Sequence, residues 1–213
     1  MFSHIIIPAA GKGTRFGGNM PKALINICGK PIIQWQLEAI PKNHDICVSV
    51  VVGFRGEEVE SLIKSLKLAN VRVLYNNNYD TTSVVDSIKV AERYFGEKVI
   101  ILDGDVLISK HHIKPFLTNE LIAIREINQW TDPVFVKLDE ENHVVEFNRS
   151  GGSHEWACVC STYSHIFQKG DNFIFNSLQR LLPCKSFLID SPEIDTQNDL
   201  RNAEIWIKTN GRN

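Results

Sequence analysis

The sequence of 213 residues lacks an excess of charge of either sign and lacks a long apolar run. Its 23 Lys and Arg residues nearly balance 25 Asp and Glu residues, which gives a formal net charge of −2. A general nucleic-acid binder needs a strongly basic surface, so this balance argues against that class. No apolar stretch approaches the roughly 18 residues that a membrane span requires. We therefore expect neither nucleic acid nor membrane as a partner.

Cysteine usage and the first residues both favour a cytoplasmic protein. The five cysteines form no CxxC pair and are odd in number, which suits free thiols better than a disulfide framework. The start Met1-Phe2-Ser3-His4 lacks the features of a signal peptide. We interpret the seven scattered histidines as surface residues.

Apolar runs alternate with helical patterns in the first half of the chain. Runs rich in Val and Ile predict strands over residues 4–8, 47–52, 71–75 and 98–102. Helices are predicted between them, over residues 31–40, 56–66 and 83–95. This alternation predicts an α/β fold, with a mostly parallel sheet flanked by helices on both faces.

The alternation of predicted strands and helices ends after Asp105. Strands are predicted over residues 121–125, 133–138, 144–147 and 156–162, with Asp139-Glu140-Glu141-Asn142 as a hairpin turn. A helix is predicted over 173–182, and Thr196-Gln197-Asn198-Asp199 approximates a capping box that begins a final helix over 196–208. Since no linker interrupts the chain, residues 1–213 are expected to form one domain with a small β-rich lobe.

The first candidate site follows the first predicted strand, at Pro8-Ala9-Ala10-Gly11-Lys12-Gly13-Thr14-Arg15-Phe16 and then Pro21-Lys22. Small residues let the backbone approach a ligand, and successive N–H groups can cradle phosphate oxygens. Arg15 and Lys22 add the charge that a triphosphate and a leaving pyrophosphate require. An ordinary glycine-rich turn with solvated charges is the alternative. The pattern fits neither the GxGxxG dinucleotide fingerprint nor the GxxxxGK[ST] loop.

Two acidic segments supply candidate metal ligands. Leu102-Asp103-Gly104-Asp105 ends the fourth predicted strand, at the edge of the sheet where ligands bind in open α/β folds. Glu193-Ile194-Asp195-Thr196 precedes the last helix, and Asp195 would bring a second carboxylate to the same edge. Carboxylate oxygens are hard ligands that suit Mg²⁺. Taken singly, each segment is also explained as a turn or helix cap.

Together these segments resemble the nucleotidyltransferase family that activates sugars and alcohols as nucleotide conjugates. AAGKGTRF…PK is similar to that family's nucleotide loop, Asp105 in LDGDV to its first metal ligand, and Asp195 in EIDT to its second. Order and spacing agree over nearly the whole chain. The resemblance implies a Rossmann-like mixed sheet and Mg²⁺-dependent transfer of a nucleoside monophosphate from an NTP to a small phosphorylated acceptor. It also implies catalytic roles for Lys22 and Arg15, and nucleotide binding by residues 9–14 and Asp103.

Two subgroups of the family share features with this sequence. Residues 76–88 look most like choline-phosphate cytidylyltransferases, whereas the short 15–22 loop and Ser83-Val84-Val85-Asp86-Ser87 are similar to cytidylyltransferases for polyol phosphates. Both resemblances imply CTP as donor, with Ser83 and Ser87 near the base or ribose. Choline phosphate or a phosphonate is the implied acceptor. The alternative is a sugar-1-phosphate or polyol-phosphate enzyme using CTP, UTP, GTP or dTTP.

The resemblance also divides the chain by role. Residues 1–120 would bind nucleotide, and 121–195 would form the acceptor-binding part and lid. Arg149 falls where many relatives place a lysine for the acceptor phosphate. Glu155 and Trp156 would hold a cationic acceptor by charge and cation–π attraction, although a Trp that opens a strand is also explained as core. A second copy of the chain, in a homodimer, is a partner that the sequence leaves open.

Two other classes of protein fit the sequence less well. A nucleotide-binding regulatory module without turnover would not need Arg15, Lys22, Asp105 and Asp195 together. A dinucleotide-dependent oxidoreductase would need a third glycine, where this chain has Phe16. Nucleotidyl transfer is therefore the function that the sequence favours.

Overall fold

The first half of the chain forms the parallel part of a single nine-stranded sheet. The structure is a computed structural model that describes residues 3–17, 19–42, 45–127 and 133–210. β1 (Ser3–Ala9) lies between β4 (Ile46–Val52) and β6 (Lys98–Leu102) and is parallel to both. β5 (Val71–Tyr75) continues the parallel pairing on β4. All four strands were predicted from their Val- and Ile-rich runs.

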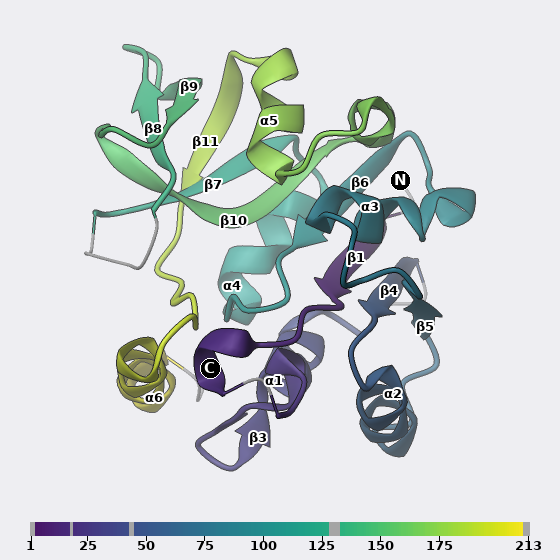
Figure 1. The fold of residues 1–213 in the computed structure, drawn as a ribbon. Helices are drawn as coiled ribbons and strands as arrows, with labels where there is room; N and C mark the ends of the chain where they lie inside the picture. The colour runs from purple at the N-terminus through teal and green to yellow at the C-terminus, as the bar shows by residue number, and fades with distance from the viewer. Residues whose placement is uncertain (1–2, 18, 43–44, 128–132, 211–213) are drawn as a thin grey trace.

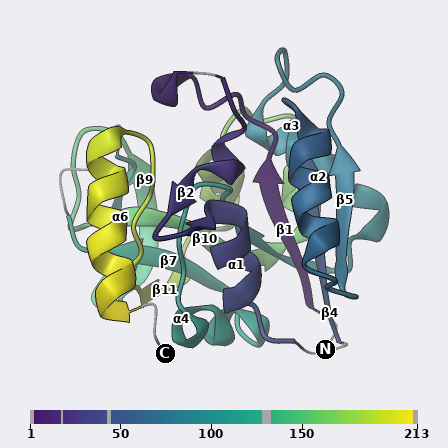
Figure 2. The ribbon, with the colours of Figure 1, turned by 90° about the horizontal axis from the view of Figure 1, so that it is seen from below.

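Helices cover both faces of this parallel part. α1 (Ile32–Ala39) and α2 (Gly56–Ser65) lie on one side of the sheet, and α3 (Val84–Lys89) lies on the other (Figure 1, Figure 2). The predicted helix 83–95 is too long, because the chain tightens after α3 into a 3-10 turn, η3 (Glu92–Tyr94). The predicted α/β fold with flanking helices is confirmed. Within the described residues, no helix is long and apolar enough to cross a membrane.

The second half of the chain adds strands of mixed direction, which are β7 (Leu121–Arg125), β8 (Phe135–Leu138), β9 (His143–Asn148), β10 (His154–Tyr163) and β11 (Cys184–Leu188). The sheet as a whole has the order β5-β4-β1-β6-β10-β7-β11-β9-β8. β10 runs antiparallel to β6 and β7, and its first residues also pair with β8. β8 and β9 form a hairpin across the predicted turn. β10 thus joins the parallel part to a β-rich lobe, visible at the upper left of Figure 1.

Short elements connect these strands, and one long helix ends the described chain. The predicted helix 173–182 is divided into α5 (Ile174–Leu178) and a 3-10 turn, η6 (Gln179–Leu181). α6 (Gln197–Asn210) begins at the predicted capping box. The remaining elements are η1 (Thr14–Phe16), η2 (Lys22–Leu24), β2 (Asn26–Ile27), β3 (Lys30–Pro31), α4 (Lys110–Ile113), η4 (Lys114–Leu117) and η5 (Ser164–Lys169).

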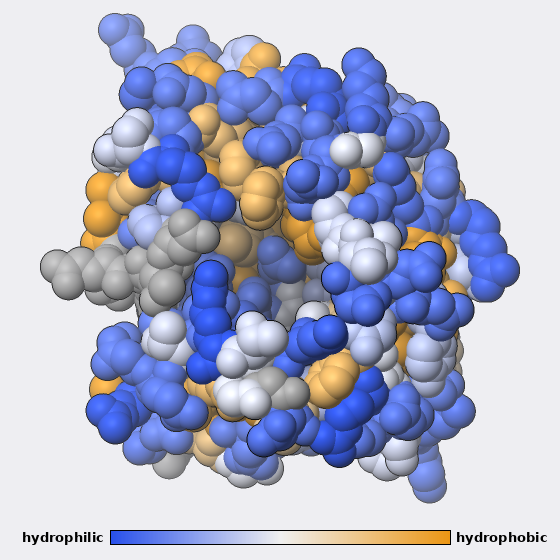
Figure 3. Space-filling view, in the orientation of Figure 1, coloured by the Kyte–Doolittle hydropathy of each residue, from blue (hydrophilic) through white to orange (hydrophobic). Residues whose placement is uncertain are grey.

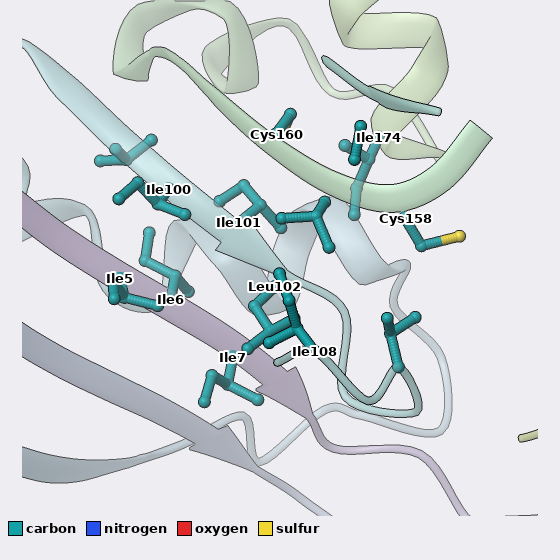
Figure 4. Packing of buried hydrophobic residues seen from close by; sticks show 14 of the residues in the cluster. Ile5, Ile6, Ile7, Ile100, Ile101, Leu102, Ile108, Cys158, Cys160 and Ile174 are labelled. Carbon is teal, nitrogen blue, oxygen red and sulfur yellow. The ribbon is translucent and has the colours of Figure 1, made fainter. Parts of the chain in front are cut away.

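The core is built around the two central strands. Ile5 to Ile7 of β1 and Ile100 to Leu102 of β6 are buried on both faces, as expected for parallel strands covered by helices (Figure 4). A separate apolar cluster holds α6 against β2 and β3, through Ala203 and Ile207 on the helix and Ile25 and Ile27 on the hairpin side. α6 is therefore fixed in place, and the residues just before it are fixed with it.

His4 is buried, contrary to the expectation that the histidines lie on the surface. Its Nε2 atom lies 2.8 Å from Ser49 Oγ, and the residue is only 1% exposed. Burial, helped by the charge of Arg72, lowers the pKa of His4 from 6.5 to about 4. The unfolded chain therefore takes up this proton at a higher pH than the folded protein does. The contribution of neutral His4 to the free energy of unfolding is therefore fully present above about pH 6.5 and is lost as the pH falls toward 4.

This linkage predicts a difference in acid sensitivity. Between pH 7 and pH 4, the free energy of unfolding should fall by about 3 kcal/mol more in the wild type than in His4→Gln. Urea unfolding at the two pH values measures this difference, and comparison with the variant subtracts the titration of the carboxylates. Equal losses in both proteins would show that His4 does not titrate in this way.

Candidate active site

Three segments meet at the carboxyl ends of β1 and β6. β1 leads into the glycine-rich loop, and β6 leads into Asp103, Gly104 and Asp105. The segment before α6 runs alongside, with a β-bridge between Val106 and Glu193 and a 3.0 Å bond from Ile194 N to Asp105 O. Gly104 is required there, because a Cβ atom would lie 2.4 Å from the Pro8 carbonyl oxygen. Residues far apart in sequence, Asp105 and Asp195, are thereby neighbours.

Four of the predicted site residues form one charged cluster. Lys22 Nζ donates to Asp105 Oδ2 and to Asp195 Oδ1, each at 2.6 Å. Arg15 Nη1 lies 2.9 Å from Asp195 Oδ2. Burial alone would lower the pKa of Lys22, but the charges of Asp105 and Asp195 outweigh it and raise that pKa above its usual value. Lys22 is therefore charged, and the cluster pairs two cations with two carboxylates.

The donor set fits Mg²⁺ bound together with a nucleotide. Asp105 Oδ1 is buried and finds no hydrogen-bond partner among the described residues. The oxygens of Asp105 and Asp195 that reach Lys22 face one common point. No group of three or more His, Cys, Asp or Glu able to hold a metal occurs in the part of the chain that the structure describes. Mg²⁺ is commonly held by one or two carboxylates plus substrate phosphates, which matches this arrangement.

Two further carboxylates lie beside this cluster. Burial, followed by the charges of Asp105 and Glu193, raises the pKa of Asp103 well above its usual value. Burial and Asp105 likewise raise the pKa of Glu193, against the opposing effect of Arg125. Glu193 was not among the predicted site residues. Its position two residues before Asp195 was an available signal, because alternate residues of an extended segment share a face.

The nucleotide loop borders a cavity of about 300 Å³. The predicted residues that line it are Ala9, Ala10, Gly11, Lys22, Ser83, Ser87, Asp103 and Asp105. Lys12, Gly13, Thr14 and Arg15 lie on the same loop but outside this lining. Gly13 has φ 61°, a left-handed conformation that suits glycine, and this turn brings the loop back against Lys22.

The two serines of this cavity are already engaged in local structure. Ser83 caps α3, because its Oγ accepts from Asp86 N while Asp86 accepts from Ser83 N. Ser87 Oγ accepts from the buried Asn76 Nδ2 at 3.0 Å. Tyr79 also lines the cavity, with Lys12 Nζ 5.6 Å from its ring centroid, and was not predicted. An aromatic residue inside the polar Asn76–Asp80 stretch was the signal for it.

A smaller cavity of about 130 Å³ adjoins the first, since Val84 and Asp103 line both. Its other lining residues include Arg149, Trp156, Phe173, Phe175, Glu193 and Asp195. Trp156 is 5% exposed and packs edge-on against Phe175 and Phe147, with its Nε1 atom unpartnered within the described chain. The guanidinium carbon of Arg149 lies 5.4 Å from the Phe175 centroid. Figure 3 shows the surface hollowed near its middle, where β1 and β6 end in Figure 1.

The cationic site predicted from Glu155 and Trp156 is not formed by that pair. Glu155 is fully buried, and Arg125 Nε donates to its Oε2 atom at 3.1 Å. Neighbouring residues of a strand point to opposite faces, so only Trp156 reaches the cavity. Arg125 also donates to Glu193 Oε2 at 2.7 Å. Glu193 is therefore the glutamate that shares the smaller cavity with Trp156.

The comparison with protein-family models matches residues 5–152 to the MobA-like NTP transferase domain. This match covers more than half of the chain, and the protein belongs to that family of nucleotidyltransferases.

Its relatives include cytidylyltransferases. The 2-C-methyl-D-erythritol 4-phosphate cytidylyltransferase of Clostridium tetani is 34% identical, over 95% of this chain and 89% of its own length. The bifunctional protein GlmU of Nitratiruptor sp. is 26% identical over 84% of this chain, which spans only 41% of GlmU.

Solved structures confirm the fold. The CTP:phosphocholine cytidylyltransferase of Streptococcus pneumoniae aligns with a TM-score of 0.81 and 20% identity, covering 97% of this chain and all of its own. The inositol-1-phosphate CTP transferase of T. maritima aligns with a TM-score of 0.76 and 18% identity, covering 99% of this chain and 96% of its own. At these identities the likeness shows the fold alone.

Proposed function

We propose that the protein is a Mg²⁺-dependent cytidylyltransferase that transfers CMP from CTP to choline phosphate or a similarly small phosphorylated acceptor, releasing pyrophosphate. The observation that carries this proposal is the meeting of two cavities at Asp103, beside the cluster of Lys22, Asp105 and Asp195. The larger cavity is bordered by the nucleotide loop, and the volume of the smaller cavity, about 130 Å³, suits a small acceptor. The names of three similar proteins include cytidylyl transfer or CTP, which supports CTP as donor.

The reaction needs positioning and charge neutralisation more than proton transfer. An acceptor phosphate oxygen attacks the α-phosphorus in line, and the bond from that phosphorus to the β-phosphate oxygen breaks. The electron pair leaves with pyrophosphate, and the anionic acceptor requires no general base. Lys22, Arg15 and the N–H groups of residues 11–14 would bind the phosphates and stabilise the leaving charge. Mg²⁺ held by Asp105 and Asp195 would supply a Lewis acid and a template.

The acceptor would occupy the smaller cavity. Arg149 would bind its phosphate, and the face of Trp156 with the carboxylate of Glu193 would favour a cationic group. The alternative acceptor is a polyol phosphate, which the 34% identity to the Clostridium tetani cytidylyltransferase favours. Both acceptors are small, and transfer to either would use CTP as donor. The two differ in whether the acceptor carries a positive charge.

A pyrophosphate-release screen tests this proposal. Each of CTP, UTP, GTP and dTTP is combined with choline phosphate, a phosphonate, polyol phosphates and hexose-1-phosphates in the presence of Mg²⁺. We expect release with CTP and choline phosphate. Release only with CTP and a polyol phosphate would favour the second acceptor class. If no pair releases pyrophosphate but the protein binds nucleotide, the result would favour a regulatory module without turnover.

Lys22 is expected to contribute strongly to turnover. Lys22→Ala should lower kcat/KM by roughly 30- to 1000-fold, since one preorganised charge on a developing oxyanion is worth about 2–4 kcal/mol. Lys22→Arg should restore little, because a planar guanidinium does not replace a compact ammonium in a tight loop. Lys64→Ala is the matched control, because the Lys64 side chain is exposed on α2, pairs with Glu60 and lines neither cavity. Full rescue by arginine would show that charge alone matters.

Substitution of Trp156 tests whether the acceptor is cationic or neutral. If its indole contacts a quaternary ammonium, Trp156→Leu should raise KM for choline phosphate about 3- to 30-fold while leaving KM for CTP nearly unchanged. Phe147→Leu is the control, because Phe147 packs on Trp156 at 6.0 Å but does not line the cavity. Equal changes in both variants and for both substrates, with a fall in melting temperature, would assign Trp156 to the core alone.

A further inference from the structure

Lys22 occupies the point that the two candidate metal ligands share. Its Nζ atom lies 2.6 Å from an oxygen of Asp105 and 2.6 Å from an oxygen of Asp195. We propose that this ammonium keeps the Mg²⁺ site closed in the nucleotide-free protein, and that the metal enters only with the nucleotide, which draws Lys22 to its phosphates. The proposal rests on the proposed function, because it takes Asp105 and Asp195 to be the metal ligands.

The geometry leaves room for one cation between these carboxylates. Mg²⁺ binds oxygen at about 2.0–2.1 Å, so an ion held by both carboxylates would overlap the present place of Lys22 Nζ. The second oxygen of Asp195 is also engaged, by Arg15 at 2.9 Å. Asp105 Oδ1 is the one oxygen of the two carboxylates that accepts no hydrogen bond from the described residues. A metal ion alone would therefore have to displace Lys22 before both aspartates could bind it.

The charges favour the same order of events. Lys22 and Arg15 neutralise Asp105 and Asp195, so the cluster has no net negative charge to attract a divalent ion. Mg²⁺ also gives up its water ligands reluctantly. A triphosphate changes this balance, because its own negative charge gives both side chains another partner. The two carboxylates are then released to the metal that the nucleotide brings.

Lys22 can change partner without a change of fold. It is the first residue of η2, it lines the nucleotide cavity beside Gly11 and Asp105, and its side chain is 18% exposed. Rotation about its side-chain bonds is enough to carry Nζ from the carboxylates toward phosphates in that cavity. The same ammonium thus serves as a stand-in for the metal before binding and as a phosphate ligand afterwards.

The test is Mn²⁺ binding without nucleotide, measured from the spin-resonance signal of free Mn²⁺. Lys22→Met should bind Mn²⁺ at least tenfold more tightly than the wild type. Lys12→Met, which removes a positive charge from the same loop, should bind like the wild type. Adding Asp195→Asn to Lys22→Met should abolish the gain. Equal Mn²⁺ affinity in Lys22→Met and the wild type would overturn the proposal.

A melting curve covers the case in which Lys22→Met folds poorly. Mn²⁺ should then raise the melting temperature of Lys22→Met and of the milder Lys22→Gln, while the wild type changes little. A melting temperature that is independent of Mn²⁺ in both variants would overturn the proposal. The proposed function is assessed separately, by pyrophosphate release from the wild type. Release without any gain of Mn²⁺ binding rejects only the role of Lys22, whereas the gain without release rejects only the transferase activity.

Discussion

Asp105→Asn and Asp195→Asn should each lower kcat by roughly 1000-fold or more while the protein keeps its fold. In the proposed mechanism, each substitution removes one charged oxygen ligand from a Mg²⁺ ion whose contribution to the transition state would be several kcal/mol. Both aspartates pair with Lys22 in the structure, so each loss also disturbs the place of that ammonium. The two losses should not add in the double variant, because the proposed mechanism has both residues act on one metal.

A matched carboxylate outside the site controls for the loss of charge. Asp139 lies in the turn between β8 and β9, where it accepts the backbone N–H groups of Glu141 and His143. Asp139→Asn should leave kcat nearly unchanged. Steady-state kinetics at limiting and saturating Mg²⁺, with a melting curve for each variant, make the comparison. Near wild-type turnover of either site variant at limiting Mg²⁺ would remove that residue from the metal site.

Arg125→Met should lower the free energy of unfolding by about 3–5 kcal/mol, the usual cost of removing one partner from a buried ion pair. The guanidinium of Arg125 is enclosed by Glu155 at 3.1 Å, by Glu193 at 2.7 Å and by the Ser191 carbonyl at 3.3 Å. Without it, two carboxylates stay in a buried region lacking the cation between them. Because Glu193 and Ser191 belong to the segment that carries Asp195, turnover should fall as well.

Urea unfolding at pH 7 measures this effect, with an exposed ion pair as control. Lys137 Nζ lies 2.7 Å from Glu146 Oε2, and both side chains are exposed. Lys137→Met should therefore cost less than about 1 kcal/mol. The double variant Arg125→Met with Glu155→Gln should recover part of the lost stability. The contrary result is that Arg125→Met lowers the free energy of unfolding no more than Lys137→Met does. That result would show that charge does not stabilise the buried group of Arg125, Glu155 and Glu193.

The regular part of the fold could be predicted because its signals are local. β1, β4 and β6 are uninterrupted Val- and Ile-rich runs, since a parallel strand covered on both faces needs apolar residues on both. β11 carries no such signal, because Lys185 and Leu188 are exposed and the strand pairs with β9 through only two residues. The shortening of α3 also depends on how the following turn packs, which the helical spacing does not record.

The site could be predicted where residues follow a strand end and could not where burial decides. Asp105 is placed by β6, and the segment before α6 carries Asp195 to the same edge. The pairing of Glu155 with Arg125 was missed, because it joins adjacent strands whose register the sequence does not reveal. The burial of His4 was missed for the same reason, since its partner Ser49 lies on the adjacent strand β4, two residues beyond Cys47, with which His4 is in register.

The fate of a label at the α-phosphate of CTP distinguishes cytidylyl transfer from hydrolysis and from binding without turnover. CTP labelled at the α-phosphate is incubated with the protein, Mg²⁺ and choline phosphate, and the products are separated. Nucleotidyl transfer predicts that the label appears in a cytidine diphosphate conjugate of the acceptor, in equal amount to the pyrophosphate released, and that Asp195→Asn abolishes it. Label recovered only as CMP would indicate hydrolysis of CTP, and label remaining in CTP with every acceptor tested would contradict cytidylyl transfer.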